Sequence, residues 1–132
     1  MRRHLLPAEA RAALDRGATV EQFLGFRTAI EGRPTLAYVW LVGGSPLRGR
    51  VEHLFDEGDP DHLDLASFEE VVDPVNDWDP ASGQPPDEDY RAFESAEEAL
   101  EWATLECGAS DGRWVNAGMV QDEYRDAHGW RV

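Results

Sequence analysis

Lysine is absent from this chain of 132 residues, so all twelve basic side chains are arginines. This absence excludes a Schiff-base lysine, a lysine general base and the lysine of a phosphate-binding loop. The chain also contains neither G-x-G-x-x-G nor G-x-x-x-x-G-K-[ST], the common glycine-rich signatures of nucleotide binding. The sequence therefore predicts no nucleotide site of these types.

Cysteine and long apolar runs are also scarce. The single cysteine, Cys107, excludes an internal disulfide. It is expected at the C-terminal end of a helix, where the helix dipole disfavours a thiolate, so we expect an inert thiol. No apolar run approaches the roughly 18 residues of a membrane span, and no apolar core of a signal peptide follows the basic start. We expect a soluble cytoplasmic protein.

Positive charge is missing from one long stretch. Residues 51–90 contain no arginine or lysine but fourteen carboxylates, whereas residues 1–50 have a local charge of +4. Residues 51–132 carry −19, which gives −15 for the whole chain. Like charges at this density repel one another, and a basic partner would relieve that repulsion. The same acids repel the phosphates of nucleic acids and anionic lipids, so we expect neither as a partner.

Hydrophobic periodicity predicts one α+β domain over residues 1–132, in which helices pack on one face of a mostly antiparallel sheet. We expect helices over residues 7–16, from 19 to about 30, 95–106 and 121–128. We expect strands over residues 36–42, at the centre of the sheet, 51–55, 62–65 and 114–120. Residues 67–70 fit a helix start and a short strand about equally. Four prolines within residues 73–90 predict a long irregular loop.

The candidate binding residues are acids of the middle of the chain and one tryptophan among them. Trp78 lies between Asp77 and Asp79, and an indole flanked by carboxylates is a suitable contact for an arginine or lysine of a partner. The alternative for Trp78 is that its ring pins the loop to the domain. The predicted partner-binding residues are Asp56, Glu57, Asp59, Asp61, Asp73, Asp77, Trp78, Asp79, Asp87, Glu88 and Asp89.

These features favour an interaction protein over an enzyme. Small acidic domains without catalytic motifs commonly inhibit cationic toxins or nucleases, because their carboxylates stand in for phosphates in a positively charged cleft. We therefore expect a bacterial protein of the immunity or inhibitor type that neutralises a basic partner. No cofactor is expected, and association of the chain with itself stays open.

The main alternative is a small metal-dependent enzyme or a calcium-binding domain that uses the acidic loop. With Asp77 as the first ligand of a twelve-residue calcium loop, Glu88 takes the twelfth place, but Ser82 stands where glycine is required. The histidines show no His-x-x-His or Glu-x-x-His spacing, so no metal site is predicted from them. A third interpretation is a structural subunit whose acidic face is merely solvated, and a further one is that the acidity reflects only habitat or genome composition.

Overall fold

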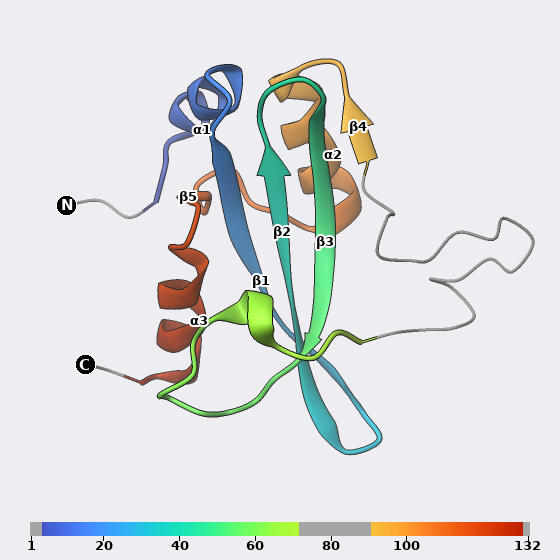
Figure 1. The fold of residues 1–132 in the computed structure, drawn as a ribbon, viewed down its shortest axis with the longest axis vertical. Helices are drawn as coiled ribbons and strands as arrows, with labels where there is room; N and C mark the ends of the chain where they lie inside the picture. Colours follow the sequence, from blue (N-terminus) through green and yellow to red (C-terminus); the bar gives the residue numbers. More distant parts are fainter. Residues whose placement is uncertain (1–3, 72–90, 131–132) are drawn as a thin grey trace, which may run out of the picture.

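The structure of the chain, a computed structural model, describes residues 4–71 and 91–130 (Figure 1). Within these residues a five-stranded sheet has the order β4-β3-β2-β1-β5, and every pairing is antiparallel. The strands are β1 (Thr19–Ile30), β2 (Arg33–Val42), β3 (Leu47–Phe55), β4 (Arg91–Phe93) and β5 (Val115–Asn116). The helices are α1 (Pro7–Asp15), α2 (Ala96–Cys107), α3 (Val120–His128) and the 3-10 turn η1 (Leu65–Ser67). The predicted α+β class is confirmed.

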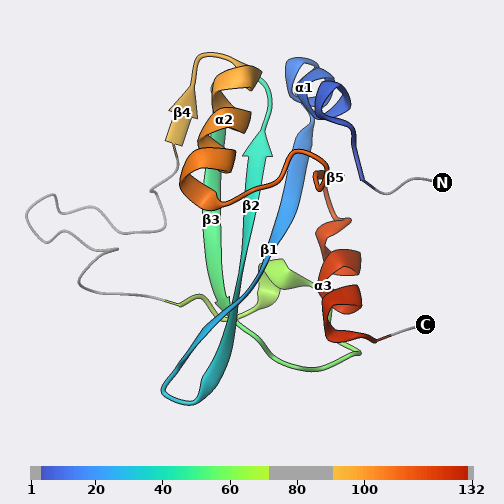
Figure 2. The ribbon, with the colours of Figure 1, turned by 180° about the vertical axis from the view of Figure 1, so that it is seen from behind.

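The sheet separates two hydrophobic cores. On one face, α1 and α2 lie over the strands (Figure 2), and Leu14 and Ala99 pack with Val39 and Leu41 of β2. On the other face, Tyr124 of α3 belongs to a second core. The members of this second core are Leu36, Tyr38, Leu54, Leu65, Phe68, Val115, Val120 and Tyr124. The expected packing of helices on one face thus describes α1 and α2, whereas α3 and η1 contribute to the opposite core.

The prediction of a helix from residue 19 to about 30 is wrong, because these residues form β1. Local signals for a helix start at Thr19 are outweighed by a ladder with β2 that reaches from Thr19 to Ile30. Gly25 partly explains why these residues form a strand and not a helix. Its φ is 102°, and it lies at a shift of register between Phe23 and Gly25. Glycine tolerates this conformation, whereas in a helix interior it would cost about 1 kcal/mol relative to alanine.

Most of the other predicted elements are confirmed. The strand over 36–42 is the central strand β2, the helix over 7–16 is α1, and the helix over 121–128 is α3. The helix over 95–106 is α2: the Ser95 hydroxyl accepts a hydrogen bond from the Glu98 amide at 3.1 Å, and Gly108 ends the helix in the left-handed conformation. The strand over 51–55 belongs to β3, which begins earlier, at Leu47.

Two predicted strands need correction. Residues 62–65 form no strand, because the Asp64 side chain accepts from the Ala66 amide and starts η1 instead. The strand over 114–120 shrinks to Val115–Asn116, since α3 already begins at Val120. Residues 67–70 end in one isolated β-bridge between Glu70 and Leu54. The irregular loop predicted over 73–90 lies outside the described residues.

No helix in the two described segments is both long enough and apolar enough to cross a membrane.

Candidate interaction surface

Asp56, the first predicted binding residue, is a buried carboxylate whose side chain is only 3 % exposed. It accepts hydrogen bonds from the Tyr124 hydroxyl at 2.5 Å and from Nε2 of His128 at 2.8 Å. Asp56 directly follows β3, so these two hydrogen bonds connect the end of β3 to α3. Burial raises the pKa of Tyr124, and the hydrogen bond to Asp56 adds to that shift. The structure thus places Asp56 in a structural bridge and away from the surface.

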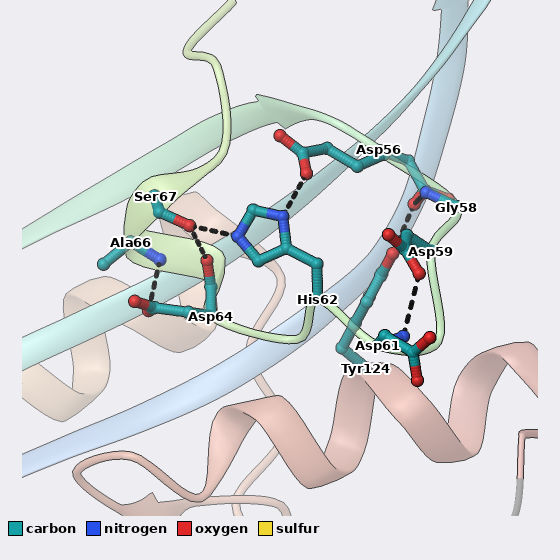
Figure 3. A network of polar contacts seen from close by, with 10 residues as sticks. Asp56, Gly58, Asp59, Asp61, His62, Asp64, Ala66, Ser67 and Tyr124 are labelled. Carbon is teal, nitrogen blue, oxygen red and sulfur yellow. Dashed lines mark hydrogen bonds and ion pairs between the residues drawn. The ribbon is translucent and has the colours of Figure 1, made fainter.

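The other described members of the predicted site lie in the same short loop (Figure 3). Asp59 accepts from the Asp61 amide at 2.9 Å, and Asp56 also accepts from the Gly58 amide at 2.9 Å. Glu57 is paired with the His62 ring. The structure therefore brings Asp56, Glu57, Asp59 and Asp61 together, but Asp56, Glu57 and Asp59 each use a carboxylate oxygen to order the loop.

Ser67, His62 and Glu57 in this loop have the order of a nucleophile, a base and an orienting acid. Nε2 of His62 lies 2.6 Å from the Ser67 hydroxyl, and Nδ1 contacts Glu57. However, the Ser67 hydroxyl also donates to the Asp64 carbonyl at 2.7 Å, so its single proton has a second acceptor. A catalytic serine must give its proton to the base, and this arrangement instead supports a loop-ordering role.

The remaining predicted binding residues lie outside the described residues; these are Asp73, Asp77, Trp78, Asp79, Asp87, Glu88 and Asp89. In residues 4–71 and 91–130, no group of three or more His, Cys, Asp or Glu side chains could hold a metal ion. Burial, assisted by the charge of Glu106, raises the pKa of the Cys107 thiol to about 11. The thiol therefore stays protonated at neutral pH, as an inert cysteine does.

A set of residues that the sequence interpretation did not select lies on the sheet face opposite α1 and α2. Glu21 of β1 pairs with Trp40 of β2, and Trp40 pairs with Arg50 of β3. In the next row, Tyr38 pairs with Glu52. Side chains two residues apart on a strand share a face, so both rows point the same way. Figure 1 shows η1 in front of the lower part of this face, with no described element in front of the upper part.

Four carboxylates act electrostatically on the Tyr38 hydroxyl. Burial raises the pKa of Tyr38, and the charges of Glu52, Glu21, Asp64 and Glu70 raise it further, in that order. They come from β3, β1, the cap of η1 and the bridge after η1. Together with the cation Arg50 and the rings of Tyr38 and Trp40, these carboxylates form a set that we call the acidic sheet patch. Its members are Glu21, Tyr38, Trp40, Arg50, Glu52, Asp64 and Glu70.

Glu52 contacts two other members of the acidic sheet patch, Trp40 and Arg50. Its Oε1 accepts from Nε1 of Trp40 at 3.0 Å and lies 3.4 Å from Nε of Arg50. Burial is the largest cause that raises the pKa of Glu52, and Glu70 raises it too, while Trp40 and Arg50 oppose the shift. Burial likewise raises the pKa of Glu21, against the hydrogen bonds that it accepts from the Gly118 and Val120 amides. The favourable contacts of Glu21 and Glu52 therefore do not fully offset the cost of burying their charges.

The outer face of α2 carries a second, different group of acids. Glu97, Glu98 and Glu101 are exposed, and at spacings of three and four residues they lie on the side away from Ala99 and Ala103. None of the three forms an ion pair in the part of the chain that the structure describes. We call these the α2 carboxylates. The sequence predicted the helix, but its exposed acids were not selected as a site.

Comparisons of the chain with models of protein families, with curated proteins and with solved structures find no match.

Proposed function

We propose that this protein is an acidic interaction module of the immunity or inhibitor type, which binds and neutralises a basic partner such as a toxin or a nuclease. The observation that carries the proposal is the outer face of α2, where Glu97, Glu98 and Glu101 have no cationic partner among the described residues. Over residues 4–71 and 91–130, nine arginines stand against twenty-one carboxylates. The excess negative charge therefore extends well beyond the acidic middle of the chain.

The distribution of the arginines supports the same function. Arg33 pairs with Glu69 at 2.6 Å and also covers the ring of Phe55. Arg125 lies 3.5 Å from Asp122, within its own helix. These ion pairs neutralise acids near η1 and on α3, but they leave the α2 carboxylates to solvent. Exposed, unpaired charge of one sign accelerates encounter with an oppositely charged surface and disfavours wrong partners.

Capture of a partner tests this function. The protein is immobilised and exposed to a lysate of its source cells at low salt, and retained proteins are eluted with about 0.3 M NaCl and identified. We expect a basic protein whose toxic or nuclease activity is abolished by one equivalent of this chain. Retention of no basic protein, or binding that is indifferent to salt, would contradict the proposal, because screening weakens surface charge attraction.

Two variants with the same net charge measure the contribution of the α2 carboxylates. One carries Glu97→Gln, Glu98→Gln and Glu101→Gln. The matched control carries Asp15→Asn, Glu31→Gln and Asp111→Asn, three exposed acids elsewhere in the chain. We expect the first variant to associate with the captured partner about tenfold more slowly at low salt, and the control to stay within about twofold of the native protein. Equal rates for the two variants would remove α2 from the interface.

A further inference from the structure

We propose that the acidic sheet patch receives a cationic side chain of the partner, specifically the guanidinium group of an arginine. This inference rests on the proposed function and assigns the contact at which the partner is anchored. Four carboxylates of the patch share the sheet face with two arginines, Arg48 and Arg50. The patch therefore keeps an excess of negative charge that a further cation would balance.

The Tyr38 hydroxyl has no hydrogen-bond partner among the described residues. Tyr38 is only 7 % exposed, yet its hydroxyl has no hydrogen bond within residues 4–71 and 91–130. Buried polar groups are nearly always hydrogen-bonded, and one that is not loses about 1–3 kcal/mol. Strand register places Tyr38 beside Glu52, and the charges of four carboxylates raise the pKa of its hydroxyl. An incoming N–H donor would find an acceptor in the Tyr38 oxygen as well as in the carboxylates.

The spacing of the carboxylates suits an organic cation better than a metal ion. In the described part of the chain, no three acidic or histidine side chains approach closely enough to coordinate one ion. A guanidinium group has five N–H donors in a plane and reaches several acceptors at once. Trp40 is half-buried beside Glu52, and an arginine stacks well on an indole ring. These properties favour arginine over lysine.

Arg50 is the resident cation of the acidic sheet patch, and its contacts with Glu52 and Glu70 are long. Its nitrogens lie 3.4 Å from Glu52 and 3.8 Å from Glu70, whereas charge-assisted hydrogen bonds measure about 2.7–2.9 Å. The ion pairs of Arg50 are therefore weak, and Glu52 and Glu70 also share a side-chain hydrogen bond. The raised pKa of Glu52 agrees with this, since Arg50 lowers it less than burial raises it.

The acidic sheet patch and the α2 carboxylates lie on opposite faces of the sheet, so they would have different roles. The α2 carboxylates are exposed, and such charges steer a partner without adding much affinity. Glu21 and Glu52 of the patch are partly buried, and Glu52 lies next to the Trp40 ring, which is the environment of residues that dominate binding energy. The anchoring contact is therefore expected at the patch.

An NMR titration tests the inference with defined probes. The protein is titrated with a blocked tetra-arginine peptide and, separately, with a blocked tetra-lysine peptide. Because Nε1–H of Trp40 donates to Glu52, its indole resonance reports directly on the patch. We expect the arginine peptide to shift this resonance and the amides of Glu21 and Glu52 saturably, with at least threefold tighter binding than the lysine peptide. Equal affinities for the two peptides would overturn the choice of arginine.

Isosteric variants separate the patch from general charge attraction. Glu52→Gln keeps an acceptor for Trp40, and Glu31→Gln makes the same chemical change at an exposed position outside both groups of acids. We expect Glu52→Gln to weaken binding of the arginine peptide at least fivefold, and Glu31→Gln to change it by less than twofold. Tyr38→Phe removes only the hydroxyl and is expected to weaken binding of the arginine peptide about threefold. If Glu52→Gln impairs folding, Tyr38→Phe replaces it as the test of the patch.

The outcomes distinguish the two proposals. If the arginine peptide shifts the amides of α2 and leaves Trp40 unchanged, or if Glu52→Gln and Glu31→Gln have equal effects, the patch is not the anchor, although the proposed function stands. If neither peptide binds and the lysate yields no basic partner, both proposals fail.

Discussion

The carboxylate of Asp56 illustrates how one acidic residue of this chain acts as part of the core. It is almost inaccessible, and both of its oxygens accept hydrogen bonds from α3. Asp56→Ala would leave the buried Tyr124 hydroxyl without its acceptor. We expect the free energy of unfolding to fall by about 2–4 kcal/mol, measured by urea denaturation. The exposed neighbour provides the control, since Asp61→Asn should change stability by less than about 0.5 kcal/mol.

Glu52 makes stability depend on pH in the opposite direction from a typical paired acid. Its pKa is raised in the folded protein, chiefly by burial, so the folded state binds this proton more tightly than the unfolded state. Stability therefore declines as the pH rises from 4.5, the ordinary value, through the raised pKa. We expect Glu52→Gln to gain stability relative to the native protein as the pH rises above 4.5, measured by denaturation at each pH.

The exposed Glu97→Gln is the control for this pH series. Its stability relative to the native protein is expected to vary little over the same range. If the stability of Glu52→Gln relative to the native protein instead falls as the pH rises, Trp40 and Arg50 fully offset the cost of burying the charge of Glu52.

At the scale of secondary-structure elements, Gly43 determines how closely α1 approaches the sheet. A Cβ at this position would lie 2.3 Å from the Leu14 carbonyl oxygen and 2.9 Å from that of Ala18. These are backbone atoms, and the Gly43 amide itself donates to Ala18 at 2.9 Å, so the contact cannot relax locally. We expect Gly43→Ala to cost about 1–3 kcal/mol or more, measured by thermal or urea denaturation.

Gly112 offers the matched substitution, because a Cβ there would meet nothing within 4 Å. Gly112→Ala is expected to be neutral or slightly stabilising. Equal stabilities of the two alanine variants would mean that α1 shifts away from the sheet at little cost.

The elements that the sequence predicted well are those determined by local signals. The Ser95 cap and the Gly108 stop both lie within or next to α2, and the structure uses both. β1 could not be recognised in the same way, because its hydrogen bonds come from β2 and the start at Thr19 also fits a helix. The single α+β sheet was nevertheless predictable, since the apolar run of β2 indicates a buried central strand.

The candidate site was only partly predictable, for a related reason. Counting acids locates negative charge along the chain, but it does not show that Asp56 is buried or that Asp59 serves a turn. The acidic sheet patch joins Glu21, Glu52 and Glu70 through strand register and one isolated bridge, which are non-local. Alternation of Tyr38 and Trp40 along one strand was the signal that could have indicated this face.

At the scale of the whole molecule, the net charge of −15 opposes the compact state, because carboxylates held together repel one another. Added salt screens this repulsion, and the Debye length falls to about 8 Å at physiological ionic strength. We therefore expect the melting temperature to rise by several degrees between about 20 mM and 300 mM NaCl, measured by calorimetry, where 1 kcal/mol corresponds to roughly 3–5 °C for a chain of this size.

The variant with Asp15→Asn, Glu31→Gln and Asp111→Asn tests the cause of that salt effect, since it changes the net charge from −15 to −12 at exposed positions. If repulsion is responsible, this variant melts above the native protein at low salt and converges with it at high salt. A constant difference at all salt concentrations would instead indicate local effects of the three substitutions. A basic partner relieves the same repulsion by supplying positive charge, so low salt should strengthen the complex while it weakens the isolated protein.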